Sequence, residues 1–356
     1  MKYCIVRMKK KEETAGNKAP DDIANICKTN EFKLIRWKQF PVGKSNIYKK
    51  LWLFLFGNMQ WMKLAIITKS GDIILYQHPS YGYKLGMFWT GILKKKDVKT
   101  IALIHDLESL RKGIIGISGI GYDTKRSDLA DGAFLKKFDI IIDHNAQMHN
   151  YFINNGFEDK KIVDLDIFDY LADELQEMPD RIYDHSLVIA GNLSRGKSEY
   201  IYKLCESKID IKLHLYGINY QNDLQKGNII YHGSYNPAVL PEKLEGNFGL
   251  VWDGDEISTC AGSQGEYLKY NNPHKTSLYL TAGIPVVVWD KAAIAEFVKN
   301  NNVGVTVGSL TEIEDILKNI PLNEYEQMVN NARIVGKKLK EGYFTSRALN
   351  EAISRI

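Results

Sequence analysis

The stretch NNPHKTSLYLTAGIPVVVWD, residues 271–290, has the pattern of a turn, a helix, a second turn and a strand. Asn272 is a suitable N-cap for the helix, and Pro273 fits the first helical position. Gly283 and Pro285 are typical of the point where a helix ends. The apolar run that follows is typical of a buried strand. A helix that leads directly into a buried strand indicates an α/β fold.

The same alternation of apolar runs and helical patterns extends over most of the chain. It predicts mostly parallel sheets with helices on both faces. In the first half, strands are predicted at 3–8, 32–37, 72–77, 100–106 and 139–144. In the second half, they are predicted at 186–192, 211–217, 228–233, 248–255, 284–290 and 303–308.

The pattern breaks near residues 165–185, where LADELQEMPDRIYDH (171–185) is polar and has no hydrophobic period. We interpret this segment as a linker between two Rossmann-like domains. Ligands of such sheets bind beyond the carboxyl ends of the strands, so the functional loops should face a cleft between the domains. The prediction is an N-terminal domain over 1–170, a linker over 171–184, a C-terminal domain over 185–338, and a C-terminal helix over 339–356 that packs back on the N-terminal domain.

Composition excludes several classes of protein. The chain has 356 residues, 44% of them hydrophobic, and a net charge of +4, which fits about two globular domains and does not suggest a nucleic-acid binder. Its four cysteines form no close pair or cluster, so free thiols in the cytoplasm are expected. The N-terminus lacks the apolar segment of a signal peptide, and LWLFLFG (51–57) is far shorter than the ~20 residues of a membrane-spanning helix.

An aromatic segment with flanking lysines, IYKKLWLFLFGNMQWMK (47–63), allows two interpretations. It could contact a membrane surface as a peripheral element. It could instead belong to the core or to a contact between subunits of a homo-oligomer, and this is the interpretation that we favour.

The helix of the opening stretch carries His274, Lys275 and Thr276 in its first turn. A cation at this helix end opposes the helix dipole, unless an anion lies between the lysine and the free backbone N–H groups. Such an arrangement is a phosphate site. The alternative is a lysine that points into water.

A second basic loop, GNLSRGK (191–197), follows the predicted strand at 186–192. Its glycine allows the backbone to approach a ligand closely, and Arg195 can bind phosphate oxygens in a bidentate way. A capped surface turn with solvated charges is the alternative. Because both basic loops follow strands of the same predicted domain, each supports the phosphate interpretation of the other.

The segment WDGDEIS (252–258) contains Asp253 and Asp255 in a D-x-D pattern, which binds Mg²⁺ or Mn²⁺ in one class of sugar-nucleotide enzymes. Lysine and arginine in the neighbouring loops already supply the positive charge that a metal would bring. We therefore interpret the motif as a turn or a sugar contact, and we expect no metal.

In the first predicted domain, the strand at 100–106 ends in His105 and Asp106, with Glu108 close behind. A histidine and carboxylates at the edge of a cleft suit general-base catalysis. Alternatively, Asp106 caps the helix that follows. Further candidates at strand ends are His78, Asn145 and Gly16.

These motifs resemble the GT-B glycosyltransferases. The resemblance is to the bacterial β-1,6-galactofuranosyltransferases of O-antigen and capsule assembly, and to the related glucosyltransferases that extend adhesin glycans. It covers most of the chain and is densest in residues 186–300. The runs that carry it are AGNLSR (190–195), FGLVWDGD (248–255), CAGSQGEYLK (260–269), NNPHKTSLYL (271–280), IHDLESLR (104–111) and HNAQM (144–148).

The resemblance implies a uridine-diphosphate site in the C-terminal domain that needs no metal. Arg195 and Lys275 would hold the diphosphate, and Tyr231 would contact the nucleotide. The first loop, with Gly16 and Ala19, would approach the donor from the other domain. The same site would be lined by Asn192, Pro273, His274, Thr276, Ser277 and Leu278.

The resemblance also implies a reaction. The enzyme would transfer a hexosyl group, foremost galactofuranosyl from UDP-galactofuranose, to a sugar hydroxyl of a cell-surface polysaccharide or of a lipid-linked glycan precursor. Transfer would proceed with inversion, and Asp106, or else His105, would be the base. The protein would act in the cytoplasm or as a peripheral protein at the inner face of the membrane.

Two other functions stay open at this point. One is a transferase that uses UDP-glucose or UDP-N-acetylglucosamine on a glycoprotein glycan. The other is a non-catalytic subunit that binds UDP-sugars or glycans. A nucleotide-sugar epimerase or dehydrogenase is disfavoured, because no G-x-G-x-x-G follows the first predicted strand.

Overall fold

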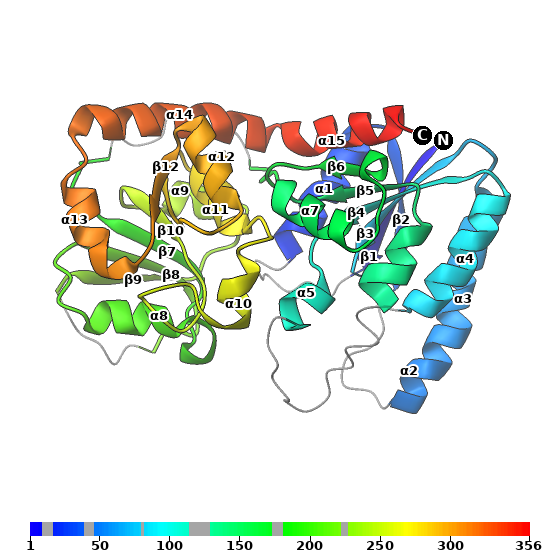
Figure 1. Cartoon of the computed structure of the whole chain (residues 1–356), viewed down its shortest axis with the longest axis horizontal. Helices are drawn as coiled ribbons and strands as arrows, with labels where there is room; N and C mark the ends of the chain where they lie inside the picture. Colours follow the sequence, from blue (N-terminus) through cyan, green and yellow to red (C-terminus); the bar gives the residue numbers. More distant parts are fainter. Residues whose placement is uncertain (9–16, 39–45, 80–81, 114–128, 173–180, 222–226) are drawn as a thin grey trace. The chain divides into compact units, whose positions relative to one another are not determined.

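The computed structural model describes residues 1–8, 17–38, 46–79, 82–113, 129–172, 181–221 and 227–356. The chain divides into two compact units, each with one six-stranded sheet and its helices (Figure 1). The predicted α/β class is therefore confirmed. Unit 1 comprises Met1–Glu12, Pro20–Leu165 and Thr345–Ile356, and unit 2 comprises Glu13–Ala19 and Asp166–Phe344.

The sheet of unit 1 is parallel, in the order β2-β1-β3-β4-β5-β6. Its central strands are almost wholly buried, as expected for a parallel sheet with both faces covered. The sequence pattern located every strand except β6, whose three residues are too few for a hydrophobic period. The strands are β1 Lys2–Met8, β2 Phe32–Lys38, β3 Ile73–His78, β4 Lys99–Ile104, β5 Ile140–Asp143 and β6 Ile162–Asp164.

The helices associated with this sheet include one from the far end of the chain. In α15, the Arg347 guanidinium donates a hydrogen bond to the Asp164 carbonyl, and Arg355 donates to the Ile162 carbonyl, both at 2.6 Å. The C-terminal helix thus packs on the N-terminal unit, as expected. The helices are α1 Lys18–Thr29, α2 Asn46–Trp52, η2 Leu53–Gly57, α3 Asn58–Ile67, α4 Tyr83–Lys95, α5 Glu108–Gly113, η3 Leu129–Phe134, η4 Leu135–Lys137, α7 Ala146–Asn154, η5 Asp159–Lys161 and α15 Tyr343–Ser354.

Unit 2 repeats the parallel architecture, in the order β12-β11-β10-β7-β8-β9. All its strands were predicted from the sequence. The strands are β7 Leu187–Asn192, β8 Leu213–Ile218, β9 Ile229–Gly233, β10 Phe248–Val251, β11 Val286–Trp289 and β12 Gly304–Val307. The helices are α8 Arg195–Glu206, α9 Leu240–Lys243, α10 Gly262–Tyr267, α11 His274–Thr281, α12 Ile294–Asn301, η6 Leu310–Glu312, α13 Ile313–Lys318 and α14 Leu322–Lys340.

Helix α11 is the buried helix of the opening stretch, and Tyr279 fixes it to the sheet. The Tyr279 hydroxyl accepts a hydrogen bond from the Ala190 amide at 2.8 Å. A Cβ on Gly249 would lie 2.1 Å from the Tyr279 ring, so only glycine leaves room for this contact. The helix begins one residue later than predicted, with Pro273 as N-cap, because the Asn272 side chain donates to the Asp166 carbonyl at 2.9 Å instead of capping the helix.

The four cysteines are free and buried, as predicted. Part of the aromatic segment 47–63 joins the core, as the favoured interpretation allows, and part of it does not. Trp61 is buried, whereas Leu51 and Phe54 are exposed. Among the described residues, we find no helix with the length and hydrophobicity that a membrane span requires.

Candidate functional site

The carboxyl ends of β7 and β8 meet in a close backbone contact. Gly191 and Gly217 have φ values of 141° and 146°, which L side chains rarely adopt. A Cβ on Gly217 would lie 1.7 Å from the Gly191 carbonyl oxygen. A Cβ on Gly191 would lie 3.5 Å from Cε of Lys275. The two basic loops predicted from the sequence therefore meet here, with the Lys275 side chain running over the glycine of the other loop.

Lys275 is held as a cation by an acidic partner. Its Nζ lies 3.1 Å from Oδ1 of Asp253 and 3.3 Å from the Trp252 carbonyl oxygen. The side chains of Lys275 and Asp253 are only 25% and 20% exposed. Burial acts to lower the pKa of Lys275, but Asp253, Tyr279 and Cys260 together outweigh it, with Asp253 the main contributor, so the pKa lies above its ordinary value. The amine is therefore protonated at neutral pH.

The D-x-D motif forms the turn that positions this partner. Gly254 has a φ of 109°, and a Cβ there would lie 2.1 Å from the Ala261 carbonyl oxygen. Asp253 thus serves as the counter-ion of Lys275.

Within the described ranges, two other groups bring enough ligand atoms together to hold a metal ion. In one of them, Nδ1 of His214 lies 2.9 Å from Nε2 of His232. Burial lowers the pKa of both histidines, so both are neutral at pH 7. The groups are His214, His232 and Glu245, and Asp143, His149 and Asp164.

His274, next to Lys275, is a neutral packing residue. Its Nε2 donates to the Asp169 carbonyl at 3.2 Å, and its ring stacks on Tyr170 at 5.0 Å. Burial lowers the pKa of His274 to about 4 despite that hydrogen bond. Because Nε2 carries the hydrogen, Nδ1 is left as an acceptor at neutral pH.

The next residues of α11 are buried. The Ser277 hydroxyl donates to the Phe168 carbonyl at 2.5 Å, whereas the buried Thr276 hydroxyl has no hydrogen-bond partner among the described residues. Leu278 is buried beside them. No side chain caps the start of α11, and the Thr276 amide donates to the Pro273 carbonyl at 3.0 Å. The helix N-terminus, where His274 and Lys275 lie, is the end that favours an anion. The residue before the helix, Pro273, is buried as well.

Arg195 is the first residue of α8, so the last three residues of the predicted basic loop 191–197 belong to the helix. Its Nη1 donates to Glu199 and its Nε donates to Gln221, both at 3.1 Å. Its guanidinium carbon lies 4.1 Å from the centre of the Tyr202 ring. These partners fix the direction of the guanidinium. Arg195 and Lys275 follow β7 and β10, which are neighbours in the sheet.

Asn192 and Tyr231 lie at the same strand ends. Oδ1 of Asn192 accepts from the Ser194 amide and from Asn219, both at 3.1 Å. The Tyr231 hydroxyl donates to the Gly217 carbonyl at 2.8 Å, while the residue as a whole is 43% exposed. Tyr231 thus presents a ring beside the contact between the two glycines.

The first loop also supplies a residue that sequence reasoning missed. Nζ of Lys18 donates to the Leu171 carbonyl at 2.5 Å and lies 4.5 Å from the centre of the Tyr170 ring, which also stacks on His274. Ala19 follows it in α1. Gly16 lies outside the described residues. The signal was present, because Lys18 is one of four lysines between the first strand and the first helix turn, and it lies directly beside Ala19.

In unit 1, His105 and Asp106 follow β4, as predicted. Nε2 of His105 lies 2.8 Å from Oε1 of Gln77. Oδ2 of Asp106 lies 3.5 Å from Nη1 of Arg111, and the carboxylate is 34% exposed. Asp106 is thus accessible and has the Arg111 guanidinium close by.

A buried histidine–aspartate pair lies at the end of β3. Nε2 of His78 is 2.8 Å from Oδ1 of Asp131, and Oδ2 of Asp131 accepts from the amide and the hydroxyl of Ser109. Asp131 therefore fixes the start of α5, which follows the loop with Asp106. It was not predicted, because residues 129–134 carry no strand-end pattern.

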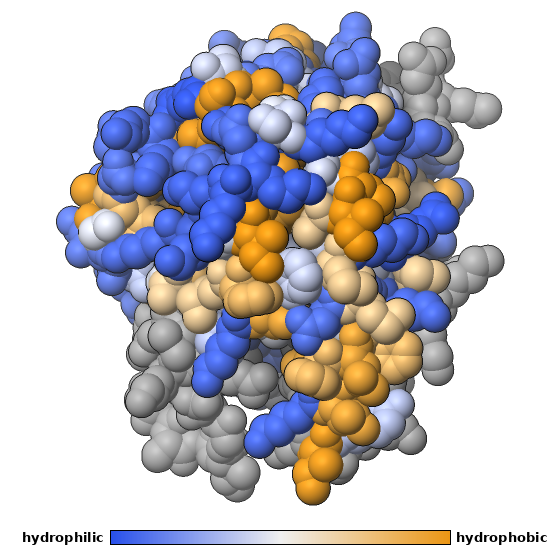
Figure 2. All heavy atoms as spheres, turned by 90° about the vertical axis from the view of Figure 1, so that its right-hand side faces the viewer, coloured by the Kyte–Doolittle hydropathy of each residue, from blue (hydrophilic) through white to orange (hydrophobic). Residues whose placement is uncertain are grey.

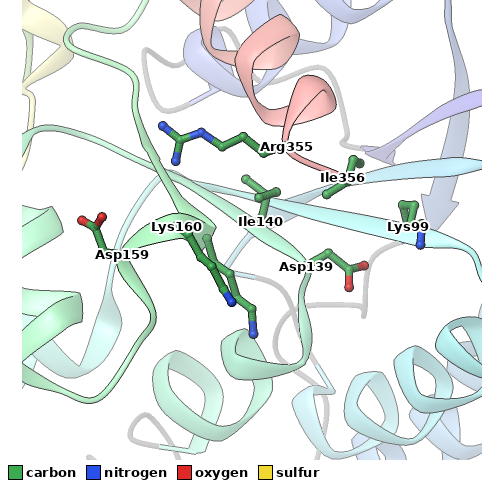
Figure 3. Close-up of a pocket in the computed structure, with 8 residues that line it drawn as sticks. Lys99, Asp139, Ile140, Asp159, Lys160, Arg355 and Ile356 are labelled. Carbon is green, nitrogen blue, oxygen red and sulfur yellow. The ribbon is translucent and has the colours of Figure 1, made fainter.

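A separate cavity of about 670 Å³ lies in unit 1 at the amino ends of β4 and β5 (Figure 3). This is the opposite end of those strands from Asp106. Ligands of doubly wound sheets bind at the carboxyl ends, so we do not assign the cavity to the catalytic site. Its lining includes Lys99, Asp139, Lys160, Lys161 and Arg355.

Comparison with known proteins decides the family. Residues 2–167 match the family described as "Glucosyltransferase 3-like, N-terminal domain", and residues 187–352 match "Glucosyltransferase 3-like, C-terminal domain". The chain belongs to the glucosyltransferase 3-like family. It is therefore a glycosyltransferase, as the sequence motifs predicted.

Individual relatives of this glucosyltransferase 3-like protein agree. The chain is 37% identical to the β-1,6-galactofuranosyltransferase WbbI of Escherichia coli (strain K12), covering 96% of this chain and 95% of the relative. It is 27% identical to glucosyltransferase 3 of Streptococcus gordonii, covering 80% of each. The lipopolysaccharide outer core galactosyltransferase WaaB matches the fold with a TM-score of 0.57 at 12% identity, over all of both chains. The GT-B fold prediction is confirmed.

Proposed function

We propose that this glycosyltransferase transfers a galactofuranosyl group from UDP-galactofuranose to a sugar hydroxyl of a cell-surface polysaccharide or of a lipid-linked glycan precursor. The observation that supports a nucleotide-diphosphate donor is the protonated Lys275 beside Gly191, at the uncapped start of α11. The 37% identity to a β-1,6-galactofuranosyltransferase supports the choice of sugar.

In this proposal, unit 2 holds the donor. The diphosphate binds to the Lys275 ammonium and to the first-turn amides of α11, with Arg195 as a second cation. The uracil and ribose lie toward Asn192 and Tyr231. As the bond from the anomeric carbon to the diphosphate breaks, these groups stabilise the charge that develops on the departing UDP. They supply the positive charge without a metal ion.

Unit 1 supplies the base in the same proposal. Asp106 accepts the proton of the acceptor hydroxyl, whose oxygen then attacks the anomeric carbon with inversion. His105 is the second candidate for this role. The reaction takes place in the cytoplasm, at the inner face of the membrane when the acceptor is lipid-linked.

The base assignment predicts a sharp loss of activity in Asp106→Asn, because the amide cannot accept the proton. We expect kcat to fall by about two orders of magnitude or more, with little change in the KM for the donor. Glu108→Gln is the matched control, because Glu108 is the other carboxylate that pairs with Arg111. A kcat for Asp106→Asn within a few-fold of the wild type would move the role to His105.

A second candidate donor is UDP-glucose, with a glycoprotein glycan as acceptor, which the similarity to glucosyltransferase 3 supports. A thermal-shift screen over UDP-galactofuranose, UDP-galactose, UDP-glucose and UDP-N-acetylglucosamine, with and without EDTA, tests donor and metal together. Turnover of the best donor on simple glycosides then separates a transferase from a non-catalytic subunit. Turnover only with UDP-glucose would overturn the galactofuranosyl proposal, and loss of turnover in EDTA would overturn metal independence.

A further inference from the structure

The strongest unexplained surface lies on α2, η2 and α3 of unit 1. Nine large apolar or aromatic side chains of this segment are each at least 44% exposed. Six of them are spaced by four, four, four, three and four positions, which places them on one side of a continuous helical segment. We name this stripe the apolar ridge. It consists of Ile47, Leu51, Leu55, Met59, Met62 and Ile66.

The opposite side of the same segment is anchored in the core. Trp61 is buried, with its ring 4.8 Å from Trp37 and 6.2 Å from Tyr76. Leu64 and Ala65 are buried next to it. The helical segment is thus apolar on both sides, and core packing explains only one of them. A helix that is apolar all round is normally buried on every side.

The ridge extends to the neighbouring helix. Phe88 of α4 is exposed, as is Phe54 beside the ridge. Figure 2, which shows the side of the molecule where α2, α3 and α4 lie, presents hydrophobic side chains in an orange band with blue side chains along its flanks. A contiguous exposed patch of this kind marks a surface that binds a partner or a membrane.

The net charge of the sequence that contains the ridge indicates the kind of partner. From Phe32, where β2 starts, to Lys96, just after α4, the sequence has 12 Lys and Arg but one acidic residue, Asp72, a net charge of +11. The whole chain carries +4, so the remainder carries 4 − 11 = −7. Lys50, Lys63 and Lys84 are exposed and have no ion-pair partner within the parts of the chain that the structure describes.

Two copies of this chain that met ridge to ridge would bring two such basic segments together, and their like charges would repel. An anionic lipid surface complements both properties, because its acyl boundary accepts the apolar side chains and its head groups attract the lysines. We propose that α2, η2 and α3 form a docking face that lies in the plane of an anionic membrane surface. This inference does not depend on which sugar the donor carries.

The test is co-sedimentation of the full chain with vesicles. We expect the protein to sediment with phosphatidylcholine vesicles that contain phosphatidylglycerol, to stay in solution with phosphatidylcholine alone, and to be released by high salt. Equal binding to both kinds of vesicle, or no binding to the anionic ones at low salt, would overturn the proposal.

Two sets of variants locate the contact. The triple variant Leu51→Ser, Leu55→Ser, Met59→Ser should lose at least about tenfold in vesicle binding. Replacing Lys50, Lys63 and Lys84 by Gln should weaken binding about a hundredfold, because each lysine near an anionic surface contributes about fivefold. Circular dichroism and thermal unfolding check that the variants fold, which is expected because the substituted side chains are exposed.

The matched control is the double variant Leu322→Ser, Ile334→Ser, which removes exposed apolar side chains from α14 of unit 2 and should bind vesicles like the wild type. Sedimentation velocity, which measures the oligomeric state, tests the alternative that the ridge binds a second copy of the chain. If the ridge variant dissociates an oligomer and the wild type does not bind vesicles, the ridge is an interface between copies of the chain.

Discussion

At the scale of single residues, the sequence identified the cation of the site but not what surrounds it. Lys275 could be found because a lysine in the first turn of a helix opposes the dipole. Its counter-ion Asp253 belongs to the D-x-D motif, which is better known for binding metal ions. Only the structure shows that Asp253 lies 3.1 Å from Lys275. From the sequence, His274 was expected to line the phosphate site beside Lys275. In the structure, burial lowers the pKa of His274, so its ring is neutral, and the ring stacks on Tyr170.

Lys275→Ala should reduce turnover about a hundredfold or more, because it removes a charge that would stabilise the departing diphosphate. It should also lower the free energy of unfolding by about 1–3 kcal/mol, because it leaves the Asp253 carboxylate largely buried without its cation. Arg195→Ala should reduce turnover while stability changes less, since the side chains of Arg195 and its partner Glu199 are each 31% exposed.

The double variant Lys275→Met, Asp253→Asn separates the two effects. Removing both charges should restore the stability measured by urea unfolding, yet leave turnover as low as in Lys275→Ala. Near wild-type turnover in the double variant would contradict the diphosphate role of Lys275.

His144 gives a prediction for pH. Burial lowers its pKa from 6.5 to about 4, and its Nε2 donates to the Ile104 carbonyl at 3.0 Å. In the window between these values the unfolded chain binds a proton that the folded chain does not, so stability falls as the pH falls. The expected loss is up to about 3 kcal/mol between pH 6.5 and 4.

Urea unfolding at a series of pH values, with wild type and His144→Gln side by side, measures this contribution. Carboxylates titrate in the same window, so the quantity of interest is the difference between the two proteins. That difference should shrink as the pH falls from 6.5 to 4. A difference that is constant with pH would show that His144 is not held neutral.

At the scale of elements, hydrophobic period located eleven of the twelve strands, and glycine and proline marked the ends of α11. The pattern could not decide which apolar surfaces are covered. Segment 47–63 was favoured as core or subunit contact, and in the structure Trp61 is buried in the core while Leu51 and Phe54 are exposed. A helix that is apolar on both sides carries no periodic signal that separates them. Asp131 was also missed, because its role depends on the distant His78.

The contact between β7 and β8 predicts that Gly217→Ala is strongly destabilising. Its Cβ would lie 1.7 Å from the Gly191 carbonyl oxygen, and the φ of 146° disfavours any side chain. We expect a loss of about 3 kcal/mol or more, together with weaker donor binding, because the backbone beside Lys275 must move. Gly196→Ala is the control in the same unit, where a Cβ has open space. Similar thermal unfolding of both variants would contradict this account.

At the scale of the whole molecule, the chain forms most of unit 1, then unit 2, and returns to unit 1 with its last residues. Asn30 Nδ2 donates to Ser346 Oγ at 2.9 Å, which links the two ends of the sequence within unit 1. The repeated α/β alternation predicted two sheets. The alternation could not show where unit 2 starts, because residues 166–172 have no regular structure. They belong to unit 2 through tertiary contacts such as the Asn272–Asp166 hydrogen bond.

This course of the chain predicts that damage to α15 acts on unit 1 alone. Leu349 is fully buried in α15, so Leu349→Ala should cost about 2–5 kcal/mol of stability. Ile334→Ala, which removes a side chain that is 60% exposed on α14, should cost less than about 0.5 kcal/mol. Urea unfolding measures both, and UDP titration calorimetry at low urea should give the wild-type affinity for each variant, because the proposed donor site lies within unit 2. A weakened UDP affinity in Leu349→Ala would mean that donor binding also requires an intact unit 1.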